Sequence, residues 1–316
     1  MADSLPIGCS LPTSGAAADF AALGGLAQAA EDLGFDSVWI SDHVVVPHHI
    51  SSAYPYTTDG SFPVSPSQPY LEPLAALGYL AGMTRRVRLG IAVLILPYRP
   101  PLLTAKMIAT LDTLSNGRID LGIGVGWMRE EFEALGVSSD VYEHRGSATD
   151  EQLHILKSAW TKDVTAYAGR FYHFDAVGAY PHPIQKPHPP IWVGGHTRAA
   201  LRRTALLGDG WLPIGGRPPA DLPPEEVRAC IARICEQAER AGRNPDALRV
   251  CFDATLNFDD DGSAFSGSPD HIARQLREYI DVGVDSFVVS FGRRSPLEVE
   301  SCLRRFAQEV RPALQR

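Results

Sequence analysis

The sequence predicts an α/β protein that folds as a single (β/α)8 TIM barrel. Eight stretches of strand length alternate with eight stretches of helical periodicity along the 316 residues. Parallel strands need crossover helices between them, and eight such units in a chain of this length close into a barrel. Nothing divides the chain at its middle, which disfavours a doubly wound open sheet and predicts one domain over residues 1–316.

The predicted strands are short apolar runs bounded by glycine, proline or charged residues. They cover residues 5–10, 36–41, 87–96, 118–126, 191–193, 210–213, 248–258 and 286–290. The third of them is rich in β-branched residues, as expected of a strand that is buried on both faces.

The predicted helices carry apolar residues three and four positions apart. They cover residues 19–33, 71–83, 100–114, 147–160, 198–207, 225–241 and 269–282, and a last helix runs from residue 297. Ser147 and Asp150 have the spacing of a capping box at the start of the fourth helix. Ser295 and Glu298 have the same spacing at the start of the last one.

Two segments interrupt the alternation. Residues 44–70 are rich in proline, serine and tyrosine without periodicity, and so long a loop is usually a lid or a binding loop. Its aromatic side chains could roof an apolar substrate, and an ordinary surface loop is an equal alternative. Residues 164–177 predict a hairpin around Gly169, and residues 181–190 a stiff extended connector. We therefore expect an extended loop after the second strand and an insertion before the fifth.

Composition excludes several classes of function. The net charge of −8, with interspersed signs, argues against nucleic-acid binding. No apolar run approaches the length of a membrane span and the first ten residues lack a secretory signal, so we expect a cytoplasmic protein without a membrane partner. Five cysteines without a CxxC pair favour reduced thiols. His48 and His49 lack further ligands at fixed spacing, so we expect no metal site.

The most informative stretch is the glycine-rich fourth strand. Its apolar run ends in Gly122, Gly124 and Gly126, and Trp127 follows directly. Glycine weakens a strand, so three alternating glycines indicate that something approaches the backbone closely. The GxGxG spacing is not a dinucleotide fingerprint. We expect Trp127 to stack against a cofactor or substrate, because it comes directly after the end of a strand.

Other polar residues follow strands that would end on the same face of the barrel. Gly194, Gly195, His196 and Thr197 precede a helix, where glycine amides and the helix N-terminus favour an anion such as phosphate. Capping of that helix by Thr197 is an equally sufficient explanation.

The second strand ends in Asp42 and His43, an acid beside an imidazole. A carboxylate can fix the tautomer of a histidine and raise its basicity, and a positioned base can take the hydroxyl proton when a hydride leaves a carbinol. Neighbouring residues on a strand point to opposite faces, so the two side chains can touch only if the strand has already ended. Otherwise Asp42 anchors a loop and His43 lines the pocket.

Several stretches together carry a resemblance that runs nearly end to end. They are AAEDLGFDSVWISDH (29–43), RVRLGIAVLILP (86–97), LDTLSNGRIDLGIGVGW (111–127), PPIWVGGH (189–196) and LGDGW (207–211). In these stretches the chain resembles the bacterial-luciferase-like superfamily, and within it the branch of F420-dependent oxidoreductases. That superfamily consists of barrels that use reduced flavin or the deazaflavin F420.

The resemblance implies roles for particular residues. It places a non-prolyl cis peptide at Ala92–Val93, in a bulge of the third strand that backs the central ring of the cofactor. It places the cofactor beside Gly124 and Gly126, and its phosphate at residues 194–197. It further implies that Arg217 points toward that phosphate, that Asp42 and His43 lie near the reactive face, and that the protein forms a homodimer.

The chain departs from the pattern at one position. Some F420 dehydrogenases carry a proton-donating glutamate where this chain has Trp127, which cannot transfer a proton. The role is either vacant or taken by Glu130 or Glu131. An exposed face at the start of a short helix is the interpretation that we favour for these two glutamates.

We therefore expect an F420-dependent oxidoreductase that acts on a small organic substrate. An FMN-dependent luciferase-like monooxygenase is the main alternative, and a non-catalytic flavin-binding paralogue is the second. Basic residues suit the anionic tail of F420, so Arg217, Arg293 and Arg294 favour F420 over FMN.

Overall fold

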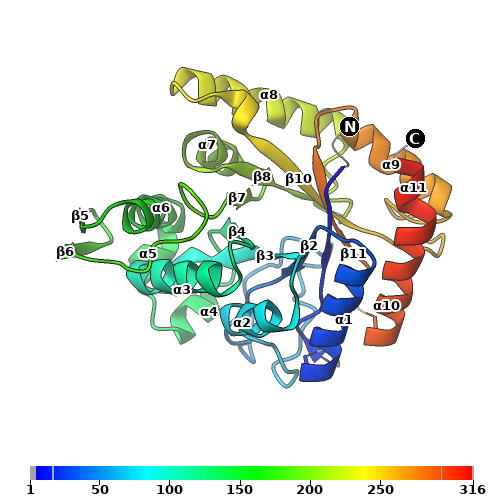
Figure 1. Cartoon of the computed structure of the whole chain (residues 1–316), viewed down its shortest axis with the longest axis horizontal. Helices are drawn as coiled ribbons and strands as arrows, with labels where there is room; N and C mark the ends of the chain where they lie inside the picture. The colour runs from blue at the N-terminus through cyan, green and yellow to red at the C-terminus, as the bar shows by residue number, and fades with distance from the viewer. Residues whose placement is uncertain (1–4, 16–17, 293, 315–316) are drawn as a thin grey trace.

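A computed structural model describes residues 5–15, 18–292 and 294–314. It confirms the predicted barrel, in which eight parallel strands close on themselves because β11 pairs with β1 (Figure 1). The strands are β1 (Ile7–Ser10), β2 (Ser37–Ile40), β3 (Arg88–Ile95), β4 (Ile119–Gly124), β7 (Ile191–Gly194), β8 (Gly210–Leu212), β10 (Arg249–Thr255) and β11 (Ser286–Ser290). Short β9 (Ile214–Gly215) continues β8 and pairs with β10.

Helices surround the strands (Figure 1). They are α1 (Phe20–Asp32), α2 (Pro73–Met83), α3 (Pro101–Leu114), α6 (Arg145–Thr161), α7 (Arg198–Leu207), α8 (Pro224–Arg240), α9 (Pro269–Ile280) and α10 (Pro296–Arg305). Shorter helical segments are η2 (Leu96–Tyr98), α4 (Arg129–Ala134), α5 (Ser139–Glu143), η3 (Pro245–Ala247), η4 (Phe306–Val310) and α11 (Arg311–Leu314). Among the described residues, every helix falls short of the length and apolarity that crossing a lipid bilayer demands.

One predicted helix start is confirmed and one is wrong. Ser295 and Glu298 form the capping box of α10. Ser147 and Asp150 do not cap α6, which already begins at Arg145 because α5 leads directly into it. Asp150 instead accepts a hydrogen bond of 2.5 Å from Nε of Arg203, so its carboxylate ties α6 to α7.

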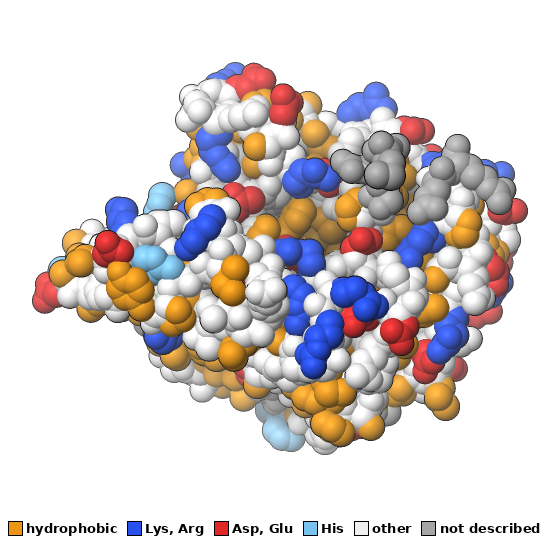
Figure 2. All heavy atoms as spheres, in the orientation of Figure 1, with side chains coloured by type: hydrophobic (Ala, Val, Ile, Leu, Met, Phe, Trp, Pro, Cys, Tyr) orange, Lys and Arg blue, Asp and Glu red, His pale blue; other side chains and the backbone are white. Residues whose placement is uncertain are grey.

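Both interruptions of the alternation are present. The strands β5 (Thr165–Ala168) and β6 (His173–Val177) form the predicted antiparallel hairpin, which projects at the edge of the molecule (Figure 1). Residues 41–69, all of them described, contain no helix or strand, and Tyr70 after them forms an isolated bridge with Ser14. Elsewhere on the face shown in Figure 2, acidic and basic side chains are interspersed.

The barrel interior is filled by side chains and is not a pore. Trp39, Leu212, Cys251 and Val288 form this inner cluster, and Ala92 and Val93 pack on it. The indole of Trp39 needs glycine on the next strand, because a Cβ at Gly90 would lie 2.2 Å from its ring. A larger apolar cluster fills the layer between the strands and the helices. Because side chains fill the barrel interior, we expect a ligand to bind at the C-terminal ends of the strands.

The third strand carries the predicted irregularity. The peptide between Ala92 and Val93 is cis, and the register of β3 against β4 shifts between Ile91 and Leu94. The glycines of β4 accommodate this bulge. A Cβ at Gly122 would lie 2.1 Å from the carbonyl oxygen of Ile91. The close approach that the glycines predicted is therefore made, at least in part, by the chain itself.

Alanine at Gly124 is expected to lower the free energy of unfolding by about 1–3 kcal/mol. Its Cβ would lie 2.5 Å from Cγ2 of Val93, a side chain that is stiff at χ1. Gly25, on an exposed position of α1, has nothing within 4 Å of a Cβ. Alanine there is expected to raise the stability by about 0.5–1 kcal/mol. Urea unfolding of both variants checks the prediction, and equal stability of the Gly124 variant would contradict it.

Candidate active site

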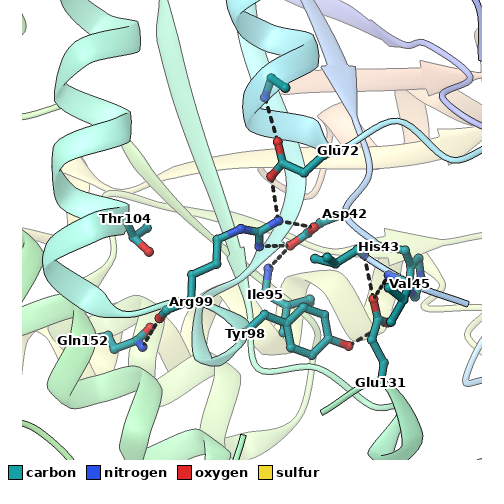
Figure 3. Close-up of polar contacts among 12 residues, drawn as sticks. Asp42, His43, Val45, Glu72, Ile95, Tyr98, Arg99, Thr104, Glu131 and Gln152 are labelled. Carbon is teal, nitrogen blue, oxygen red and sulfur yellow. Dashed lines mark hydrogen bonds and ion pairs between the residues drawn. The ribbon is translucent and has the colours of Figure 1, made fainter. Parts of the chain in front are cut away.

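His43 and Glu131 meet at the C-terminal ends of β2 and β4. Nδ1 of His43 donates a hydrogen bond of 2.7 Å to the Glu131 carboxylate. Gly126, at φ 82°, turns the chain after β4 so that α4 begins at Arg129 and directs Glu131 back toward the barrel. Figure 3 shows this carboxylate between His43 and Tyr98. The structure thus supplies the acid–imidazole pair that the sequence predicts, but with a different acid.

Glu131 is fully buried and accepts four hydrogen bonds. The amides of Val44 and Val45 donate to one carboxylate oxygen at 2.7 and 3.2 Å. His43 and the hydroxyl of Tyr98, at 2.9 Å, donate to the other. The predicted exposed helix face is therefore wrong for Glu131, because a carboxylate with four donors is stable in the interior. Its position fixes both the imidazole and the start of the loop after β2.

Burial and the charge of Glu131 raise the pKa of Tyr98 well above its ordinary value. Tyr98 is therefore a neutral hydroxyl that donates to Glu131. Proton transfer through Tyr98 at neutral pH is unfavourable for the same reason. Among the residues around this carboxylate, His43 carries a ring nitrogen that can both accept and donate a proton.

Asp42 points away from His43 and binds the chain that follows the bulge of β3. Its carboxylate receives both terminal nitrogens of Arg99, at 2.7 and 2.9 Å, and the amide of Ile95 at 2.9 Å (Figure 3). The contact between Asp42 and His43, which the sequence left open, is absent from the hydrogen bonds of the described residues. Neighbouring residues point in opposite directions, as the alternation of an extended chain requires. Asp42 therefore anchors the chain that follows the cis peptide.

Asparagine at Asp42 is expected to lower the free energy of unfolding by about 1–3 kcal/mol, because it weakens two charge-assisted hydrogen bonds in the interior. Glu72 offers a matched control, since it contacts the same guanidinium at 2.9 Å but is 35% exposed. Glutamine at Glu72 should change the stability by less than about 1 kcal/mol. Urea unfolding measures both effects, and an Asp42→Asn variant with unchanged stability would show that Asp42 does not anchor the bulge.

Aromatic side chains of the loop 44–70 lie over His43. The ring of Phe62 is 4.7 Å from the imidazole between centroids, and that of Tyr70 is 5.4 Å away. Trp127 contacts His43, Tyr54 and Phe62 at 6.4, 5.2 and 5.5 Å. We call Tyr54, Phe62, Tyr70 and Trp127 the aromatic roof. Because it lies over the strand ends, this group of side chains would cover an organic ring bound at the barrel mouth.

Glu130, in α4, binds the loop that carries the aromatic roof. One of its carboxylate oxygens accepts the amides of Ser51 and Ser52 at 2.7 and 3.1 Å. The amide of Arg129 in turn donates to the hydroxyl of Ser52 at 3.1 Å. These contacts hold the loop in place over His43 without burying it in the core.

Residues 194–197 join the end of β7 to α7. Gly195 has φ 85°, and a Cβ there would have only Ala200 within 4 Å. The hydroxyl of Thr197 accepts the amide of Ala200 at 3.2 Å, so the predicted cap is confirmed. The remaining amides of a first helical turn have no partner within the helix. His196 and Thr197 are exposed, so this segment can accept an anion from solvent.

Arg217 lies near the C-terminal ends of β10 and β11. It donates to the hydroxyls of Thr255 and Ser290 at 2.6 and 3.1 Å, on β10 and β11. The role at the cofactor phosphate that the resemblance implies for Arg217 stays a prediction. Arg294 donates to Asn257 at 2.7 Å, and Arg293 lies outside the described residues. Arg217 and Arg294 both line a cavity of about 550 Å³.

The family model of luciferase-like monooxygenases matches residues 5–265. The chain belongs to this family. Its fold and its cis peptide agree with the resemblance drawn from the sequence, which is thereby confirmed at the level of the family.

Relatives of this luciferase-like protein include users of F420 and of FMN. An uncharacterized protein of Mycobacterium tuberculosis is 37% identical over 218 residues, 69% of this chain and 72% of that protein. The F420-dependent glucose-6-phosphate dehydrogenase of Nakamurella multipartita is 31% identical over 241 residues, 76% of this chain and 64% of the dehydrogenase. The FMNH2-dependent dimethylsulfone monooxygenase of Pseudomonas putida is 29% identical over 218 residues, 69% of this chain and 57% of the monooxygenase.

The fold is also shared with solved structures. An F420-dependent secondary alcohol dehydrogenase in complex with an F420–acetone adduct aligns with a TM-score of 0.77 over 98% of this chain and 99% of that one. At 17% identity the likeness shows the fold alone.

Two functional residues escaped the sequence analysis of this luciferase-like chain. Arg99 and Tyr98 follow the third strand. Polar residues directly after a strand lie at the C-terminal end of the barrel, as His43 does, and this signal could have identified them. Their partners, Asp42 and Glu131, lie after β2 and in α4, and they could not be assigned from spacing. The expected exposure of Glu130 is also only partly right, because one of its carboxylate oxygens is buried without a partner among the described residues.

Proposed function

We propose that this protein is an oxidoreductase that transfers a hydride between F420 and a small organic substrate, an alcohol or its carbonyl product. The observation that carries the proposal is the hydrogen bond of 2.7 Å between His43 and the buried Glu131, below the aromatic roof and near the bulge of β3. It places a proton-exchanging group at the barrel mouth, where this fold keeps its chemistry.

The residues of the site fit a flat tricyclic ring with an anionic tail. Val93, next to the cis peptide, lies against Gly124 and Gly194, since a Cβ on either glycine would come within 2.8 Å of its methyl groups. Gly124 and Gly194 therefore present no side chains beside Val93, so a flat ring could lie there. The first turn of α7, with Gly195 before it, would hold the phosphate of the tail through backbone amides.

His43 carries the proton in this proposal. Its Nδ1 donates to Glu131, so in the neutral imidazole Nε2 carries the free lone pair. Oxidation of an alcohol breaks a C–H bond and an O–H bond, and Nε2 takes the hydroxyl proton. The chemistry that F420 would supply when bound is acceptance of the hydride. Glu131 stabilises the imidazolium that forms, and in the reverse direction the imidazolium returns the proton to the carbonyl oxygen.

The choice between cofactors depends on the chemistry of the site. The dyad of His43 and Glu131 serves a reaction in which a proton and a hydride move together. The identity to the F420-dependent dehydrogenase extends over 76% of the chain. An FMN-dependent monooxygenase is the second candidate, because the relative from Pseudomonas putida is nearly as similar.

Titration of the purified apoprotein with F420 and with FMN, followed by fluorescence quenching, tests the proposal. We expect saturable binding of F420 and no binding of FMN at equal concentration. Loss of absorbance at 420 nm in the presence of a panel of secondary alcohols then tests turnover. Tight binding of FMN without binding of F420 would reverse the assignment in favour of the monooxygenase.

A further inference from the structure

Asp253 is a buried carboxylate that the proton transfer at His43 does not use. On β10, Phe252 and Ala254 belong to the outer core, whereas Cys251 belongs to the cluster inside the barrel. Side chains alternate along a strand, so Asp253 points into the barrel, one layer above Cys251 toward the C-terminal strand ends. Its backbone pairs with Ile214 and Val288 on the flanking strands. The carboxylate therefore lies inside the barrel, toward the C-terminal strand ends.

Asp253 lacks the partners that buried carboxylates normally have. The residue is 6% exposed, and its Oδ1 has no hydrogen-bond partner among the described residues. Burial raises the pKa of Asp253, and the charge of Arg217 opposes this rise. Asp42 and Glu131, in the same barrel, each accept three or more hydrogen bonds. A buried acceptor left without a donor is unfavourable for folding and is a candidate functional group.

Hydrogen bonds to two hydroxyl groups hold the guanidinium of Arg217 near Asp253. Thr255, two residues further along β10, and Ser290 on β11 each accept a hydrogen bond from its guanidinium. The two hydroxyls also contact each other at 2.9 Å, which forms a rigid platform. A guanidinium has five N–H donors, and this platform uses two of them. Within the described residues, no ion pair joins Arg217 to Asp253.

Aromatic rings of the loop 44–70 extend from His43 to the surroundings of Arg217 and Asp253. The Tyr56 ring lies 5.5 Å from that of Tyr54, which lies 5.3 Å from Phe62, which in turn contacts His43. Tyr56 lines the cavity of about 550 Å³ together with Arg217 and Thr255. Burial and the neighbouring charge of Asp253 raise the pKa of Tyr56 to about 12, against the effect of Arg217. One continuous layer of aromatic rings thus covers both places.

We propose that Asp253 and Arg217 form a subsite that binds a hydroxyl group of the organic substrate across the barrel mouth from His43. A hydroxyl can donate to the free oxygen of Asp253 and accept from the guanidinium of Arg217. An ammonium group would be repelled by Arg217 and a carboxylate by Asp253, so the pair selects a neutral group that is both donor and acceptor. The substrate class is an alcohol with a second hydroxyl, which rests on the proposed function.

Matched cyclic alcohols test the subsite. Cyclohexanol and its 1,2-, 1,3- and 1,4-diols differ only in the second hydroxyl and in its distance from the first. We expect at least one diol to bind the F420-loaded protein about tenfold or more tightly than cyclohexanol in isothermal titration calorimetry. Asp253→Ala should reduce that ratio to near one. Equal affinity for all four compounds, or no binding of any, would overturn the subsite.

The stability of Asp253→Asn separates a binding role from a structural one. The amide keeps the volume and removes an unpaired buried charge, so this variant should melt at a higher temperature while its preference for the diol falls. A lower melting temperature would indicate that Asp253 stabilises the fold, and it would contradict the proposal. Asp246→Asn is the control, because Asp246 is exposed in η3 at the other end of β10. Neither its melting temperature nor its preference should change.

Binding of F420, measured separately, distinguishes the two proposals. If no variant binds F420, the cofactor assignment fails. The alcohol titrations are then run on the apoprotein, since the subsite consists of the chain's own side chains. The other case is that F420 binds equally to wild type and to Asp253→Ala. In that case, a wild type without a preference for the diol, or a variant that keeps the preference, would show that the subsite alone fails.

Discussion

Alanine at His43 is expected to lower kcat for F420-dependent alcohol oxidation by about 100- to 10,000-fold, the range of a positioned general base. The dissociation constant for F420 should stay within about a factor of two, because the ring and phosphate are held by backbone and aromatic groups. The large effect follows from the loss of the lone pair at Nε2, for which the surrounding described side chains offer no substitute within reach of the same position. Tyr98 is held neutral by Glu131, and Trp127 has no exchangeable acid proton at neutral pH.

Stopped-flow absorbance at 420 nm measures the loss of turnover, and fluorescence quenching measures the binding of F420. His48→Ala is the matched control, because His48 belongs to the same loop but is exposed. It should keep both values of the wild type. Full turnover by His43→Ala would exclude His43 as the proton carrier, and loss of F420 binding alone would favour a non-catalytic cofactor-binding protein.

The barrel could be predicted from the sequence because its signals are local. The cap at Ser295 and Glu298, the apolar run of β3 and the turn at Gly169 each specify a short element without reference to the rest of the chain. Fixed alternation of eight strands with eight helices then leaves few ways to close the sheet. The capping box expected at Ser147 failed because another element, α5, ended directly before the helix.

The partners within the site could not be predicted in the same way. His43 and Glu131 are 88 residues apart, and Asp42 and Arg99 are 57 residues apart. Spacing along a chain carries no information about such pairs, and only the closed barrel brings their strand ends together. The adjacency of Asp42 and His43 suggested a contact between them that the structure does not show. The alternation of an extended chain already argued against it.

Glu131 shows why charge alone is a poor guide to exposure. Two neighbouring glutamates at a helix start are normally solvated, and Glu130 partly follows that rule. Glu131 is buried because the turn at Gly126 directs it toward two backbone amides at the start of the loop after β2. Those amides have no strand partner, so one carboxylate satisfies the backbone and the imidazole together. The position of the His43 imidazole and the path of the loop therefore depend on the same side chain.

Alanine at Glu131 is expected to lower the free energy of unfolding by about 3–5 kcal/mol, because four donors lose their shared, fully buried acceptor at once. Glutamine keeps the volume but removes the charge that stabilises the imidazolium. It should unfold at a urea concentration between those of wild type and the alanine variant, and it should lower kcat by about 100-fold or more. Urea unfolding and the absorbance assay measure the two effects independently.

Glu133 provides the control for Glu131, since it lies on the same short helix with an exposed side chain. Alanine at Glu133 should change the stability by no more than about 0.5 kcal/mol and leave turnover unchanged. A stable Glu131→Gln variant with normal turnover would mean that the imidazole works without a charged partner. A loss of turnover in that variant with F420 binding preserved would instead assign Glu131 as the positioning residue for His43. The aromatic roof provides a further check, because the loop 44–70 begins at the two backbone amides that donate to Glu131. Loss of this carboxylate in Glu131→Ala should loosen the loop, so we expect Trp127 to become more accessible to fluorescence quenching by iodide.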